Sequence, residues 1–262
     1  MPFTAAHPLA VVPLLGRLGL DPTCLVIGSM APDFEYFVRA EQVSTISHTL
    51  AGLVLWSLPA TLILAALLHG IVKWPMLLVA PVAIARRMAR IVARPWRARV
   101  GFGALVSCVA SALIGSATHL LWDGLTHAQG FGPKHYRALK TPITLPILGP
   151  TVVHRALQHA SSLLGVTVLA ALIFRSLWRS KPIALPPAPR ALARVVVIAC
   201  VAVAVSLTIT RLVGKRATDP GDLIVGAIAG LLAGVLVASA LLAPRAHRLQ
   251  RAVAGVSTSA SV

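Results

Sequence analysis

The chain has 262 residues, of which 57% are hydrophobic and only 12% are charged, and its mean hydropathy is +0.83. An average soluble domain carries about 25% charged residues, and a soluble fold with so few charges would expose large apolar patches to water. This composition therefore excludes an ordinary soluble protein and predicts an integral membrane protein of the α-helical kind.

The net charge is +17, because 24 Lys and Arg residues face only seven Asp and Glu residues. The basic residues sit in short clusters between apolar runs and beside no recognised DNA-binding or RNA-binding motif, so we expect no nucleic-acid partner. Basic residues that flank membrane spans hold loops in the cytoplasm and attract anionic lipid. Membrane lipid is the partner that this charge predicts.

Five runs are apolar and long enough to cross about 30 Å of hydrocarbon, which takes about 20 helical residues. They are 49–72, 103–122, 160–178, 193–212 and 223–242. Pro59 is expected to kink the first of them, and the shorter run 75–85, which contains Pro81, is expected to lie at the membrane interface. We therefore predict an all-α polytopic bundle of about five transmembrane helices with short interfacial helices.

Basic segments at 86–99 and 175–194 and a basic C-terminal tail are the cytoplasmic candidates under the positive-inside rule. Alternation then places the first 48 residues, the loop 123–159 and the short loop around Asp219 outside the cell membrane. The predicted organisation is a motif-bearing membrane domain, a Pro-rich basic loop, a C-terminal pair of spans and a disordered basic tail. Their bounds are 1–178, 179–192, 193–243 and 244–262.

The three cysteines, Cys24, Cys108 and Cys200, are far apart and show no CxxC spacing. This spacing implies no structural disulfide. Cys108 and Cys200 lie in apolar runs, where a thiol acts as a small hydrophobe.

The strongest local pattern is ATHLLWDGLTHAQG, in which His119, Asp123 and His127 are spaced four residues apart. On a continuous helix they share one face, and two ligands four apart on a helix can grip one metal ion. Gly124 could end the helix before His127. A buried structural histidine bonded to Asp123 explains the pair equally well.

A second pattern is GSMAPDFEYF, where Asp33 follows Pro32 and Glu35 comes two residues later. An acid at such a turn can simply cap the next helix. Two further histidines argue for more than a cap, because His7 and His48 fall on the same predicted side of the membrane.

A third pattern is HRALQHASSLLG, where His154 and His159 are five residues apart. That spacing matches one helical face poorly, so both are not expected to bind one metal. His159, with Gln158 beside it, is the better candidate for contact with a substrate or a lipid headgroup.

Seven of the nine histidines fall on one predicted face with Asp33, Glu35 and Asp123. Imidazole and carboxylate together suit zinc, manganese or non-haem iron. No GxSxG elbow, Walker loop or kinase motif is present, so nucleophilic serine or cysteine schemes have no support.

The blocks GSMAPDFEYF, SHTLAGL, ATHLLWDGLTH and LQHASSLLG occur in this order within roughly residues 1–175. In this the chain resembles the uncharacterised bacterial membrane family described as domain of unknown function 4184. The resemblance implies a multi-pass protein of the bacterial inner membrane, and it implies no particular reaction.

The arrangement is also distantly similar to membrane-bound metal-dependent hydrolases. That similarity implies a set of metal ligands at the matching positions. They are His7, Asp33, His48, His119 and Asp123. Where that group often has a further acid two residues after the Pro-Asp, this chain has Glu35.

The first hypothesis is a metal-dependent hydrolase of a phosphoester or lipid-linked substrate at the outer membrane surface. Glu35 or His127 would be the general base, and His159 and Gln158 would contact the substrate. Arg137 and Lys140 could offer charge to a phosphate, although such loop residues are more often simply solvated.

Two alternatives stay open: a non-enzymatic protein in which the same residues form a structural metal site or a polar helix-packing cluster, and a proton or metal transporter. The last two spans carry no ionisable group at depth, which disfavours a transporter.

Overall fold

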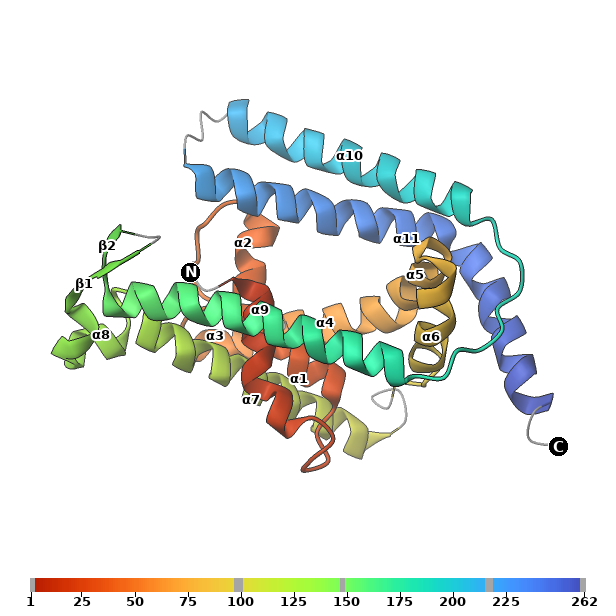
Figure 1. The fold of residues 1–262 in the computed structure, drawn as a ribbon, viewed down its shortest axis with the longest axis horizontal. Coiled ribbons are helices and arrows are strands. Elements are labelled where there is room, and N and C mark those ends of the chain that lie inside the picture. The colour runs from red at the N-terminus through yellow and green to blue at the C-terminus, as the bar shows by residue number, and fades with distance from the viewer. Residues whose placement is uncertain (1–2, 97–100, 147–148, 215–218, 260–262) are drawn as a thin grey trace. The chain divides into compact units, whose positions relative to one another are not determined.

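The computed structural model describes residues 3–96, 101–146, 149–214 and 219–259, with side chains up to 253. Five of its helices are long and apolar enough to cross a membrane (Figure 1). They are Leu50–Val79, Phe102–Thr126, Val153–Arg179, Arg190–Gly214 and Pro220–Val253. The predicted helical, multi-pass architecture is confirmed.

The first span is longer than the sequence predicts. It consists of α3 (Leu50–Gly52), a π-helical turn, α4 (Leu58–Leu67), a second π-helical turn and α5 (Lys73–Val79). The first π turn ends at Ser57, two residues before Pro59, where a proline disrupts regular hydrogen bonding.

The run 75–85 is therefore not a separate interfacial element, and that expectation is wrong. Residues 75–79 complete the first span, and α6 (Val82–Val92) begins after Pro81. The break falls at Ala80, which adopts an extended conformation (ψ 148°) because a following proline excludes the helical one.

The described chain forms two compact units, each assembled from three separate segments. The first unit comprises Met1–Phe34, Ser44–Ile63 and Arg97–Ile173, and the second Glu35–Val43, Leu64–Trp96 and Phe174–Val262. The boundary within α9 (Val153–Arg179) falls between Ile173 and Phe174.

In the first unit, the N-terminal residues form a helical hairpin. The 3-10 helix η1 (Thr4–Leu14) leads into a tight turn, and α1 (Pro22–Gly28) returns toward the short 3-10 helix η2 (Ala31–Asp33). Gly16 and Gly19 take positive φ angles of 75° and 67° in the turn, which glycine adopts without strain.

Helix α1 lies alongside α7 (Phe102–Thr126), and two hydrogen bonds show that they run in the same direction. The Asp21 N–H donates to Ser111 Oγ at one end, and Ser116 Oγ donates to the Gly28 carbonyl further on. Helix α1 thus packs against α7 along its seven residues.

Small residues allow α1 and α7 to approach closely. A Cβ atom on Gly28 would lie 2.6 Å from the Ala112 carbonyl oxygen, so only glycine fits there. Cys24 on α1 and Cys108 on α7 form a disulfide, with Cα atoms 5.4 Å apart. The sequence expectation of no disulfide is wrong, because helix packing joins two cysteines that are 84 residues apart.

Two short elements follow α7: α8 (Phe131–His135) and the 3-10 turn Arg137–Lys140. Strands β1 (Pro142–Leu145) and β2 (Gly149–Val152) then pair antiparallel before α9 begins. This hairpin is the one sheet in the described part of the chain.

The second unit holds α2 (Phe34–Arg39) except Phe34, all of α5 and α6, and the antiparallel pair α10 (Arg190–Gly214) and α11 (Pro220–Ser259). Its core includes Leu77, Leu78 and Leu242. Helix α11 continues past residue 243, where the sequence predicts the last span to end and a disordered tail to begin. Residues 260–262 of that tail lie outside the described part.

Candidate metal centre

Four side chains of the first unit converge on one point. Asp33 ends η2, His48 precedes α3, and His119 and Asp123 stand one turn apart on α7. One ligand atom from each of the four lies within 4.8 Å of all the others. Asp33, His119 and Asp123 are buried, with 1%, 0% and 6% of their surfaces exposed.

The separations between these atoms fit ligands around a single ion. His119 Nε2 lies 3.4 Å from Asp33 Oδ1 and 3.3 Å from Asp123 Oδ2, and His48 Nε2 lies 3.4 Å and 3.6 Å from the same two oxygens. Tetrahedral ligands bound at about 2.0–2.1 Å stand about 3.3–3.4 Å apart. The four residues therefore form a buried cluster that could hold a metal.

Unsatisfied polar atoms face this point. Among the described residues, Asp33 Oδ1 and His119 Nε2 are buried side-chain atoms with no hydrogen-bond partner, and Asp123 Oδ1 and His7 Nε2 share this property. A buried polar atom without a partner is costly, and a self-contained polar network would pair its members. This observation fits a metal ion better than a helix-packing cluster.

Neighbouring oxygen atoms orient the two imidazoles. His119 Nδ1 lies 2.8 Å from the Ser29 carbonyl oxygen, which can only accept, so Nδ1 carries the proton and Nε2 keeps its lone pair. His48 Nδ1 lies 3.0 Å from the hydroxyls of Ser44 and Ser47. Such second partners fix the ring and tautomer of metal-binding histidines.

Thr4 orients Asp33, since its Oγ1 donates a 2.6 Å hydrogen bond to Asp33 Oδ2 and leaves Oδ1 facing the imidazoles. We expect Thr4→Val to weaken metal binding about 10- to 100-fold, as loss of such a partner typically does. Titration of the metal-loaded protein with a chelator measures this. Thr4→Ser keeps the hydroxyl and serves as the control, and equal affinity in the two variants would contradict the role.

His7 lies at the edge of the cluster. Its ring stacks on that of His119 with centroids 3.7 Å apart, and its Nε2 is 3.6 Å from Asp123 Oδ1. Burial lowers the pKa of His7 to about 4, with His119 adding to the shift, so the ring is neutral at neutral pH. His7 is thus adjacent to the four-residue group and outside the set that shares one point.

The electrostatics of the cluster favour positive charge. Burial by itself raises the pKa of Asp33, but the adjacent His119 and His48 imidazoles hold that pKa well below its usual range. Burial likewise opposes the charged form of His48, and the carboxylates of Asp123 and Asp33 outweigh it and raise the pKa. Two carboxylates in a buried site also balance the charge of a divalent cation.

His127 follows the last residue of α7, because the helix continues past Gly124 to Thr126. Its Nδ1 lies 3.0 Å from the Asp123 carbonyl oxygen and 3.7 Å from Asp123 Oδ1. Because that carbonyl oxygen accepts a hydrogen bond from the Nδ1–H, Nε2 is the basic nitrogen. Its side chain is 32% exposed, and burial lowers the pKa of His127.

Glu35 occupies a different setting, on α2 in the second unit. Its carboxylate accepts hydrogen bonds from Arg39 Nε at 3.0 Å and Nη2 at 2.8 Å, and its side chain is 2% exposed. A carboxylate held by a guanidinium is a poor proton acceptor. Its role as a base stays a prediction, less supported than that of His127.

The two residues of α9 that are expected to contact substrate differ in exposure. Gln158 is buried and His159 is exposed. His154 is also buried, and its Nδ1 donates to the Leu139 carbonyl oxygen at 2.9 Å. That bond gives His154 a structural partner, and the substrate roles of Gln158 and His159 stay predictions.

Sequence reasoning did not identify Thr4, Ser29, Ser44 or Ser47. Only the two serines that precede His48 carry a local signal, because they lie within four residues of it. Thr4 meets Asp33 across 29 positions, and Ser29 meets His119 through a backbone carbonyl across 90. No side-chain pattern encodes such a contact.

Asp21, Cys24 and Cys108 form a second group of potential ligands in the described chain. The two cysteines are paired with each other, and Asp21 Oδ1 accepts from the Cys24 N–H as the N-cap of α1. Ordinary structural roles therefore account for all three residues.

Comparison with known proteins gives one result. The family model described as "Domain of unknown function (DUF4184)" matches residues 1–240. That range covers the whole cluster and extends beyond the blocks recognised in the sequence into α11. The searches of curated proteins and of solved structures found no match. The chain therefore belongs to the family described as domain of unknown function 4184.

Proposed function

We propose that the protein is a metal-dependent hydrolase that acts on a phosphoester or lipid-linked substrate at the outer surface of the inner membrane. The single observation that carries this proposal is the convergence of Asp33, His48, His119 and Asp123 on one buried point. Zinc, manganese and iron are the ions that such ligands suit. A divalent ion held there would acidify a bound water and polarise a phosphoryl oxygen.

The cluster residues would hold the ion, and His127 would serve as the general base. His127 Nε2 is the basic nitrogen, and its side chain is partly exposed at the end of α7. Partial exposure supports this role, because a base must reach both the substrate and the solvent that removes its proton.

Nearby basic side chains are consistent with a negatively charged substrate. Lys134, Arg137 and Lys140 are exposed in the connection that follows α7. By alternation of the spans, this connection emerges on the same side of the membrane as the cluster. Exposed cations near a substrate site raise the local concentration of phosphate-bearing molecules.

We expect His127→Gln to retain its metal and to lose about 100- to 10,000-fold in turnover, the usual contribution of a general base. The measurement is phosphate release from nitrophenyl phosphate esters and alkyl phosphates by metal-loaded protein. His135→Gln is the matched control, because His135 also bonds a carbonyl four residues earlier yet lies outside the cluster.

Two results would overturn the proposal. One is a metal-loaded wild-type protein that hydrolyses none of these esters. The other is turnover in His127→Gln equal to that of His135→Gln, which would remove the proposed base and leave the structural metal site as the better account.

A further inference from the structure

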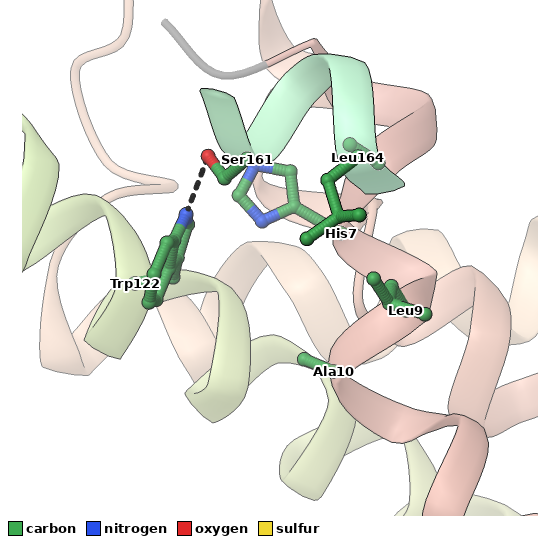
Figure 2. Close-up of a pocket in the computed structure, with 7 residues that line it drawn as sticks. His7, Leu9, Ala10, Trp122, Ser161 and Leu164 are labelled. Carbon is green, nitrogen blue, oxygen red and sulfur yellow. Dashed lines mark hydrogen bonds between the residues drawn. The ribbon is translucent and has the colours of Figure 1, made fainter. Parts of the chain in front are cut away.

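An apolar pocket of about 220 Å³ adjoins the cluster, between η1, α7 and α9 (Figure 2). It is lined by Ala6, His7, Leu9, Ala10, Trp122, Ser161 and Leu164.

Most of this lining is hydrocarbon, contributed by the alanines and leucines of η1 and α9. The indole N–H of Trp122 donates to Ser161 Oγ at 3.2 Å (Figure 2). That bond satisfies the polar atom of the indole and leaves its ring as an apolar wall. An occupant of this part of the pocket therefore needs no hydrogen-bonding groups.

The His7 ring lies between the pocket and the cluster. It lines the pocket, and it also stacks on His119 and places Nε2 3.6 Å from Asp123 Oδ1. A molecule that fills the pocket is thus separated from the cluster by a single imidazole ring. Its polar end would need to extend only past His7 to reach the candidate metal centre.

The pocket borders an apolar part of α9. Leu164 lies in the apolar run 160–178, four residues after its start, or about 6 Å along the helix at about 1.5 Å per residue. It is 60% exposed, as is expected of a side chain that faces the bilayer. A pocket that opens at this depth is supplied from the hydrocarbon region, where free polar metabolites are excluded.

We infer that this pocket binds the hydrocarbon chain of a phosphate-bearing lipid, whose headgroup then lies at the cluster. The inference rests on the proposed function and narrows its substrate class to single-chain or chain-splaying phospholipid esters. At about 220 Å³ the pocket is smaller than the roughly 300–1,000 Å³ of sites that enclose a whole drug-sized ligand. It therefore takes the part of the chain nearest the headgroup, and the remainder lies among bilayer lipids.

The test uses the fluorescence of Trp122 in full-length, metal-loaded protein reconstituted into phosphatidylcholine vesicles. The probe is dodecyl phosphonate with two bromine atoms in its chain, because bromine quenches indole on contact and a carbon–phosphorus bond resists hydrolysis. Brominated dodecane without a headgroup reports simple partition into the bilayer. The fluorescence of Trp122 is obtained by subtracting the emission of Trp122→Phe from that of the wild type.

The expected result is saturable quenching of Trp122 by the phosphonate and only linear quenching by the alkane. Ala10→Phe should lose the saturable component, because Ala10 lines the pocket and a phenyl ring fills it. Ala5→Phe is the matched control, since Ala5 is exposed on the same helix η1 and lies outside the pocket lining. It should behave as the wild type.

Linear quenching by both probes, or an Ala10→Phe variant that still saturates, would overturn the inference. Metal content measured on the same samples separates this failure from that of the proposed function. Metal-loaded protein with linear quenching rejects the lipid pocket alone. Protein that binds no metal rejects the hydrolase, and its quenching curve still decides whether the pocket takes the chain.

Discussion

The double variant His119→Ala, Asp123→Ala is expected to lose its bound metal while the wild type retains about one ion per chain. Both residues contribute ligand atoms to the same point, and removing them leaves only Asp33 and His48. Loss of one hydrogen-bond partner of a metal ligand weakens metal binding about 10- to 100-fold. Loss of two ligands should therefore weaken it by at least about 100-fold. Inductively coupled plasma mass spectrometry of detergent-purified protein measures the ion.

His135→Ala controls for the general effect of losing a surface histidine, since His135 is exposed on α8. It should keep the metal content of the wild type. The metal centre would be rejected if the wild type held no ion after reconstitution with zinc, manganese and iron. An ion that persisted in the double variant would place the binding site elsewhere.

The second large effect concerns the contact between α1 and α7. A Cβ atom on Gly115 would collide with the Leu25 carbonyl oxygen and would lie 2.7 Å from the Ser29 nitrogen. These are backbone atoms, so α1 itself would have to move. We expect Gly115→Val to lower the melting temperature by about 5–10 °C, since overpacking costs about 1–3 kcal/mol and each kcal/mol shifts a chain of this size by about 2–4 °C.

The same variant should also bind metal more weakly, because moving α1 displaces the Ser29 carbonyl from His119. Gly103→Val is the matched control, since Gly103 lies on the same helix and a Cβ atom there meets nothing within 4 Å. The melting temperatures of the two variants are compared in detergent, with unfolding monitored as loss of the monodisperse peak in size-exclusion chromatography. Equal melting temperatures would show that the glycine contact is not required for stability.

The membrane spans could be predicted because hydropathy is a property of contiguous residues. All five appear in the structure, and only their ends differ. The first span continues past residue 72 because a π turn (Leu68–Val72) maintains the helix up to Ala80. Helix α11 continues well beyond residue 243 although Pro244 lies inside it. The Ala and Arg residues that follow Pro244 favour helix.

The four residues that converge could be predicted for two different reasons. His119 and Asp123 are one helical turn apart, so their proximity is local. Asp33 and His48 are predicted from their place on the same side of the membrane and from the resemblance, because no periodicity links them to α7. The contacts of Thr4 and Ser29 and the pairing of Cys24 with Cys108 depend on how the N-terminal hairpin packs, which a single sequence does not reveal.

The N-terminal hairpin also sets an order of biogenesis. Its residues leave the ribosome before the helix that they pack against, which begins at Phe102 and carries a cluster residue as late as Asp123. Asp33 and its neighbours can therefore pack against α7 only after this second span has been inserted. Any metal would then bind late in biosynthesis, to chains whose N-terminal hairpin has already packed against α7.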